Sequence, residues 1–70
     1  MGIYGRIFSM RMVSDNNILL SLLNTAMRDG DMTLDELCER EDIDVNEIVE
    51  RMDSIGYSYD ENTRSFRRNG

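Results

Sequence analysis

The chain has 70 residues, which is enough for one small domain and too few for a second. Its single cysteine excludes an intrachain disulfide and a cysteine-based zinc site, and the absence of histidine excludes imidazole chemistry. The net charge of −6 is unevenly distributed, because residues 29–62 carry thirteen acids against two arginines, whereas residues 63–70 add three arginines. An acidic middle repels phosphate backbones and favours either basic partners or solubility alone.

Residues 1–13 precede the first capping signal, and we assign them to an N-terminal extension. Arg6 and Arg11 interrupt its apolar stretch before the core of a signal peptide can form. Arg6 also stands where a myristoylation signal needs serine or threonine. No run in the chain approaches the ~20 apolar residues of a membrane span. We therefore expect a cytoplasmic protein without membrane contact.

The first predicted helix covers residues 16–29. Ser14-Asp15-Asn16 is a cluster of N-cap residues placed directly before an apolar run with three- and four-residue spacing. Arg28 suits the last turn of a helix, and Gly30 is expected to stop this helix in the left-handed conformation.

Two further helices are predicted from start signals eleven residues apart, at residues 33–41 and 44–55. Thr33 caps the first of them, with Glu36 reaching back to form a capping box, and Asp44 caps the second. Gly56 is expected to end the last helix. The apolar positions expected in the core are, helix by helix, Ile18, Leu19, Leu22, Leu23, Ala26 and Met27; Leu34, Leu37 and Cys38; and Val45, Ile48, Val49, Met52 and Ile55.

A two-stranded hairpin is predicted over residues 57–67. An even loop pairs Tyr57 with Phe66 and Tyr59 with Arg64, which leaves the three aromatic side chains on the core side. The last residues, 68–70, are expected to fray, as is Arg67. The predicted fold is thus a small α+β domain over residues 14–67, with three helices followed by a two-stranded hairpin.

This order of elements resembles a winged helix-turn-helix domain. The positioning helix would begin at Thr33, the helix in the recognition position at Asp44, and the wing would run from Tyr57 to Arg67. The resemblance implies nucleic-acid binding, although domains with the same helical hairpin also serve other roles.

A closer resemblance covers residues 10–66. Over this range the chain is similar to a bacterial domain-of-unknown-function family of short proteins, through the stretches DNNILLSLLNTAMRDG, LDELCE and SIGYSYDE. The chain departs from that pattern at Asn16, where a proline is expected, and in the residues before Met10. The resemblance implies a bacterial or phage origin and brings no assigned activity.

Nucleic-acid binding would use the exposed start of the third helix and the hairpin. The residues available for it are Asn46, Arg51, Arg64, Arg67 and Arg68. The carboxylates of Asp44, Glu47 and Glu50 share that helix face and oppose phosphates that need cations. A small DNA-binding transcriptional regulator is therefore the alternative prediction and not the favoured one.

Neither a metal site nor catalysis is expected. Asp29, Asp31, Thr33 and Asp35 have the spacing of a calcium loop, but Leu34 and Arg40 stand where that loop needs glycine and glutamate. Cys38 is in phase with the apolar face of its helix, where a buried thiol is inert. We expect no enzyme, no cofactor and no metal.

The favoured function is a non-catalytic interaction module that binds a protein partner or a second copy of itself. The extension is the predicted contact material, because the three-helix core is complete without it and a large exposed apolar patch marks a contact. Apolar residues that alternate with polar ones in this extension fit a strand, and apolar residues at three- and four-residue spacing fit a helix. A frayed arm is the third possibility. The residues concerned are Ile3, Tyr4, Ile7, Phe8, Met10 and Met12.

Overall fold

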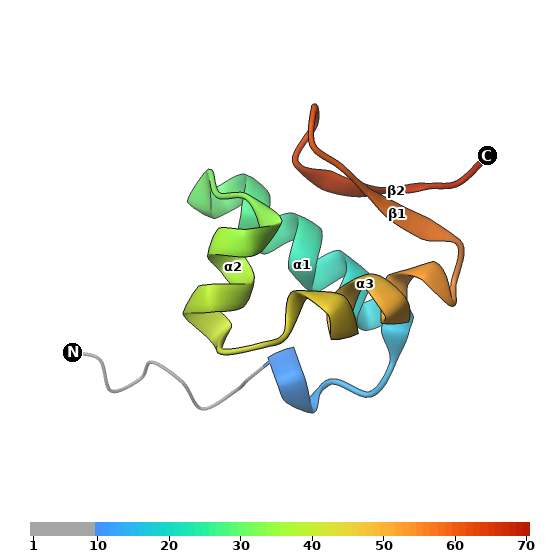
Figure 1. The fold of residues 1–70 in the computed structure, drawn as a ribbon, viewed down its shortest axis with the longest axis horizontal. Helices are drawn as coiled ribbons and strands as arrows, with labels where there is room; N and C mark the ends of the chain where they lie inside the picture. Colours follow the sequence, from blue (N-terminus) through green and yellow to red (C-terminus); the bar gives the residue numbers. More distant parts are fainter. Residues whose placement is uncertain (1–9) are drawn as a thin grey trace.

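A computed structural model describes residues 10–70 of the chain (Figure 1). It contains three helices followed by a two-stranded antiparallel hairpin, which confirms the predicted α+β fold. The elements in chain order are the 3₁₀ turn η1 (Met10–Met12), helices α1 (Asn16–Gly30), α2 (Leu34–Glu41) and α3 (Val45–Asp53), and strands β1 (Tyr57–Asp60) and β2 (Ser65–Arg68). In the described part of the chain, no helix is both long and apolar enough to cross a bilayer.

The three helices begin where the capping residues predict. The Asp15 carboxylate accepts backbone hydrogen bonds from the first turn of α1. Thr33 and Glu36 form the expected capping box, with the Thr33 N–H donating to Glu36 Oε1 at 2.9 Å. The Asp44 carboxylate accepts from the Asn46 N–H at 2.9 Å. Each side chain satisfies amide groups that a helix start leaves without partners.

The end of α1 differs from the prediction, whereas α2 ends at Glu41 as predicted. Gly30 is the last residue of α1, and the left-handed stop falls on Asp31, with φ of 52°. α2 ends in the same way on Asp42, with φ of 60°. Aspartate tolerates this conformation better than most residues, and the following amides close onto the last turn of each helix. The predicted stop at Gly30 is therefore wrong by one residue.

A side chain at Gly30 would require only that the flexible end of Met32 move aside. A Cβ atom built at this position would lie 2.6 Å from the Cε of Met32, whose side chain folds back against the end of α1. Gly56 has φ of 84°, but α3 itself ends at Asp53 with Ser54 as its C-cap, so the predicted helix over residues 44–55 ends two residues early and Gly56 belongs to the turn that follows.

The core draws on all three helices, β2 and η1. Its buried members are Met10, Leu19, Leu23, Met27, Leu34, Leu37, Cys38, Ile48, Met52 and Phe66. Two residues predicted to be buried lie at the surface instead: Ile18 is 54% exposed and Val49 is 40% exposed. Helices of this length cannot turn every apolar position towards a core this small, so the outermost positions of each apolar stripe stay in contact with solvent.

The hairpin has the predicted facing but a different register. Tyr59 pairs with Phe66 and Tyr57 with Arg68, two residues along from the predicted pairs. The loop is residues 61–64, because Arg64 adopts a left-handed conformation with φ of 54° and the Asp60 carboxylate accepts from the Asn62 N–H. A register shift of two residues keeps each side chain on the same face of the hairpin. Tyr59 and Phe66 therefore share the predicted face, and their ring centroids lie 5.6 Å apart.

The C-terminal residues are held by this longer pairing. Arg67 and Arg68 belong to β2, and the Asn69 N–H donates to the Gly56 carbonyl at 2.8 Å. The Asn69 side chain also accepts from the Ser58 hydroxyl at 2.6 Å. The segment expected to fray therefore completes the strand pairing. The hairpin as a whole lies over one side of the helices, with β2 beside α1 and β1 beside α3 (Figure 1).

Candidate interaction surfaces

The arginine on α3 is bound within the domain. Arg51 Nε donates to the Asn16 side-chain oxygen at 2.7 Å, and its Nη2 donates to the Val13 carbonyl at 2.7 Å. The guanidinium is part-buried and joins α3 to the segment that enters α1. A side chain held at both of its donor edges has little freedom to reach a nucleic-acid base or phosphate.

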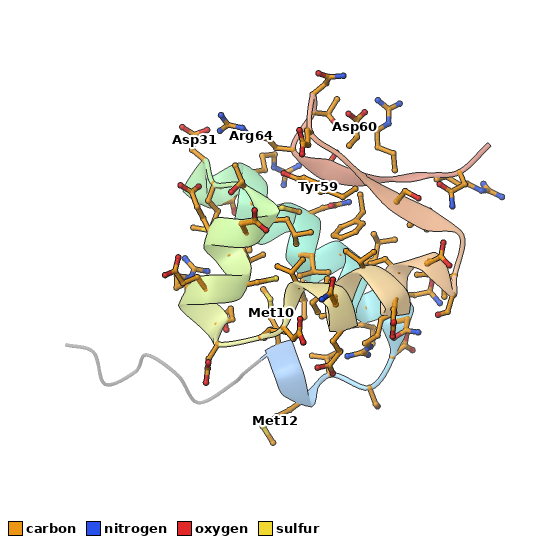
Figure 2. All side chains as sticks on the ribbon, in the orientation of Figure 1. Met10, Met12, Asp31, Tyr59, Asp60 and Arg64 are labelled. Atoms are coloured by element: carbon orange, nitrogen blue, oxygen red, sulfur yellow. The ribbon has the colours of Figure 1, made fainter. Side chains whose placement is uncertain are left out.

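The hairpin arginines are also close to carboxylates. Arg64 Nη1 lies 3.0 Å from Asp31 Oδ1, and Arg67 Nη1 lies 3.8 Å from Asp60 Oδ2. Figure 2 shows Arg64 and Asp31 pointing toward each other between the hairpin loop and the end of α1. Arg68 is exposed at the end of β2. Each of the two pairs is partly exposed and contributes little to stability, but its carboxylate offsets part of the positive charge that the hairpin presents.

The start of α3 presents a predominantly acidic face. Asn46 is exposed there as the sequence predicts, and its neighbours Asp44, Glu47 and Glu50 are exposed as well. The structure therefore places the five predicted nucleic-acid residues in different environments. Arg51 is bound within the domain and Asn46 stands among carboxylates, whereas Arg64 and Arg67 lie near Asp31 and Asp60 and Arg68 is exposed.

Of the predicted protein contacts, only Met10 and Met12 lie within the described residues. Met10 is 8% exposed and packs in the domain's own core, whereas Met12 is 80% exposed (Figure 2). Ile3, Tyr4, Ile7 and Phe8 lie outside the described residues. The core of the domain thus begins at Met10, four residues before the predicted boundary, and Met12 is the large apolar side chain that η1 leaves to solvent.

A groove of about 480 Å³ lies between the starts of α2 and α3 and the hairpin. Its apolar wall is formed by Leu34, Val45, Val49 and the ring of Tyr59. The Tyr59 hydroxyl accepts a hydrogen bond from the Leu34 N–H at 3.3 Å, which fixes the strand against the first turn of α2. The remaining lining residues are polar: Thr33, Asp35, Glu61 and Arg64.

Residues 13–66 match the model of a protein family described as a domain of unknown function, DUF4250. This match spans most of the 70 residues. The chain belongs to the DUF4250 family. Comparison with curated proteins and with solved structures found no match for it.

The lone cysteine of this DUF4250 domain has the character of a core residue. Cys38 is 2% exposed, and burial raises the pKa of its thiol from 9.0 to about 11, with smaller contributions from the carboxylates of Asp35 and Asp44. A thiol that stays protonated near neutral pH is a poor nucleophile. In residues 10–70, no three acidic or cysteine side chains converge in a way that would hold a metal ion.

Two residues that shape the surfaces of the DUF4250 domain were not predicted. Asn24 pairs with the backbone of Phe66: its side-chain oxygen accepts from the Phe66 N–H at 2.8 Å, and its Nδ2 donates to the Phe66 carbonyl at 3.2 Å. A polar residue within the apolar stripe, four after Leu20 and three before Met27, is the signal for it in the sequence. Val49 was assigned to the core, and only the packing of α3 shows that it lines the groove.

Proposed function

We propose that this DUF4250 domain is a non-catalytic interaction module that binds protein rather than nucleic acid. The observation that supports the proposal most is that Arg51 on α3 is already bound within the domain. Arg51, the one cation among the candidate residues on α3, is bound to Asn16 and Val13, and the exposed groups beside it are carboxylates. Nucleic-acid affinity comes largely from cations that replace the counterions of phosphates.

The absence of catalysis in this proposal rests on Cys38 and on the acidic side chains of α2 and α3. Cys38 is buried with a raised pKa, and the carboxylates of α2 and α3 lie on exposed helix faces. Catalytic acids and nucleophiles are usually found in clefts that shift their pKa towards the working pH. The resemblance to a short bacterial family supports a bacterial or phage protein, and the single thiol supports action in the cytoplasm.

The second candidate is a small DNA-binding regulator with a winged-helix arrangement. The order α2, α3 and hairpin supports it, as do Asn46 and Arg68, which are exposed. In such a protein α3 would enter the major groove and the hairpin would contact the backbone. The acidic face of α3 weighs against it.

Purification of the tagged chain from its native host distinguishes the two functions. We expect a protein partner that stays bound after nuclease treatment. The matched control is a double variant, Asn46→Ala with Arg68→Ala, which removes two exposed groups that a DNA binder would use and leaves the core untouched. The partner should be retained by this variant. Recovery of nucleic acid that the double variant fails to retain would overturn the proposal.

A further inference from the structure

The outer edge of β1 has backbone groups free for pairing. In an antiparallel ladder, two opposite residues point their N–H and C=O groups either towards each other or both away. The backbone groups of Phe66 point away from β1, because both are bonded to Asn24. Its partner Tyr59 must therefore point its own N–H and C=O away from β2, and so must Tyr57 two residues earlier.

These four groups have no hydrogen-bond partner among residues 10–70. The two edges of the hairpin are thus unequal at the Tyr59–Phe66 pair, since Asn24 of α1 covers the β2 edge there while the β1 edge is open. An open edge pairs readily with an extended segment.

The groove lies directly beside this open edge. Tyr59 belongs to both, because its backbone forms the edge and its ring forms part of the groove wall. A strand added to β1 would place alternate side chains over the exposed apolar surface of Val45 and Val49. Asp35 and Glu61 give the rim of the groove negative charge, and the nearby Arg64 is paired with Asp31. The surface therefore fits an apolar, extended segment that carries positive charge.

We propose that the occupant is the N-terminal segment of a second copy of this chain, residues 3–8, which adds as a strand to the open edge of β1. This proposal rests on the proposed function, a module that binds protein, and it names a second copy of the chain as the partner. Residues 1–9 contain Arg6 as their one charged side chain, so the segment is complementary to the acidic rim. Ile3 and Ile7 would share one face of an extended segment, with Gly5 between them.

The position of Met10 favours a second copy over the chain's own segment. Figure 2 shows Met10 on the side of the helices away from the hairpin, whereas Tyr59 lies beneath the hairpin. The N-terminal segment is therefore attached, at Met10, on the side of its own domain opposite the hairpin. Six residues span about 20 Å when extended, which is longer than the four-residue β1. Reciprocal exchange of this segment between two copies gives a closed dimer.

Sedimentation of the full-length chain over a range of about 10 µM to 1 mM tests the proposal, since a weak dimer populates with concentration. We expect a monomer–dimer equilibrium. Val49→Lys places a cation in the groove and should weaken the dimer at least about tenfold, as should the double variant Ile3→Ser with Ile7→Ser. Ile18→Lys is the matched control, because Ile18 is similarly exposed but lies on α1 and does not line the groove.

Hydrogen exchange of the unmodified chain gives a second readout that needs no variant. The amides of Tyr57 and Tyr59 should become protected as the concentration rises, while Ser58, which pairs with Arg67, should not change. A chain that remains monomeric, a dimer that survives Val49→Lys, or protection of Tyr59 that is independent of concentration would each overturn the proposal. None of these outcomes bears on nucleic-acid binding, so this proposal can fail while the proposed function stands.

Discussion

Asn24 is a polar residue in the apolar stripe of α1, and its side-chain amide forms the two backbone hydrogen bonds that a neighbouring strand would form with Phe66. It accepts from the N–H of Phe66 and donates to the carbonyl of Phe66, at 2.8 and 3.2 Å. The amide thereby closes the outer edge of β2 at Phe66 and attaches the hairpin to α1. Phe66 itself is 3% exposed, so its backbone groups have little access to water if the amide is removed.

Replacing Asn24 with alanine should destabilise the domain by about 1–3 kcal/mol, because two backbone groups lose their partners and remain mostly buried. Chemical denaturation followed by circular dichroism measures the free energy of unfolding. Thr25→Ala is the control, since Thr25 is exposed on the same helix and should change stability by less than about 0.5 kcal/mol. Equal stability of the two variants would show that the Asn24 amide does not hold the hairpin.

Cys38 offers a test of burial through its chemistry. With its pKa raised to about 11, the folded thiol is about 1% ionised at pH 9, whereas a thiol with the ordinary pKa of 9.0 is half ionised. Alkylation at pH 9 should therefore be at least about fifty-fold slower in the folded chain than in denaturant. Mass spectrometry of timed samples measures the two rates. Similar rates would mean that the thiol is solvated.

The same pKa shift sets a direction for stability against pH. The folded chain holds the thiol proton more tightly than the unfolded chain does. Its contribution to stability is therefore complete below pH 9 and is lost as the pH rises through about 11.

At the level of elements, Arg51 connects α3 to the segment that precedes α1. Its guanidinium uses two donors in a fixed fork, one to the Asn16 side chain and one to the Val13 carbonyl. A lysine at this position keeps the charge but presents a single ammonium group in place of the fork. The connection is therefore geometric as well as electrostatic.

Arg51→Lys should lower the free energy of unfolding by about 1–2 kcal/mol, since at least one charge-assisted hydrogen bond is lost. Thermal or chemical denaturation checks this. Arg28→Lys is the matched control, because Arg28 and its partner Asp29 are both mostly exposed, and a change below about 0.5 kcal/mol is expected. If both variants are as stable as the unmodified chain, then Arg51 is free for another role.

The elements themselves were predictable because their signals are local. The caps at Thr33 and Asp44 depend on a few neighbouring residues, and the structure confirms both. The register of the hairpin was not predictable in this way. The register depends on the left-handed conformation of Arg64. This conformation is uncommon for an arginine, and no sequence pattern predicts it here.

The candidate surfaces were less predictable than the fold, since they depend on packing. The spacing of Val49 fits the core, yet the way α3 packs leaves Val49 at the groove. Arg51 looked free on an exposed helix face, and only the fold brings it to Asn16 and Val13, more than thirty residues away in sequence. Residues 14–67 were expected to be complete without the extension, but Met10 contributes to the core. Contacts between distant segments decide each of these cases.

At the scale of the whole molecule, the distribution of charge decides which partners can approach. The chain has a net charge of −6, and three of its eight arginines lie in the hairpin, where Arg64 and Arg67 are near carboxylates. An approaching duplex therefore meets more negative than positive charge on the face that holds α3. A basic or apolar protein segment meets no such barrier. The account predicts a domain whose binding to DNA is limited by its own carboxylates.

Titration of a labelled mixed-sequence duplex with the chain, followed by fluorescence anisotropy, tests whether the carboxylates of α3 limit binding to DNA. A double variant, Glu47→Lys with Glu50→Lys, serves as the comparison, because it reverses the charge of the α3 face and should raise the affinity. For the unmodified chain we predict a Kd weaker than about 1 µM at about 50 mM salt, within the range of non-specific attraction. A Kd tighter than this, with an affinity that drops steeply as salt is added, would contradict this prediction. It would show that several phosphates are bound by arginines that the structure pairs within the domain.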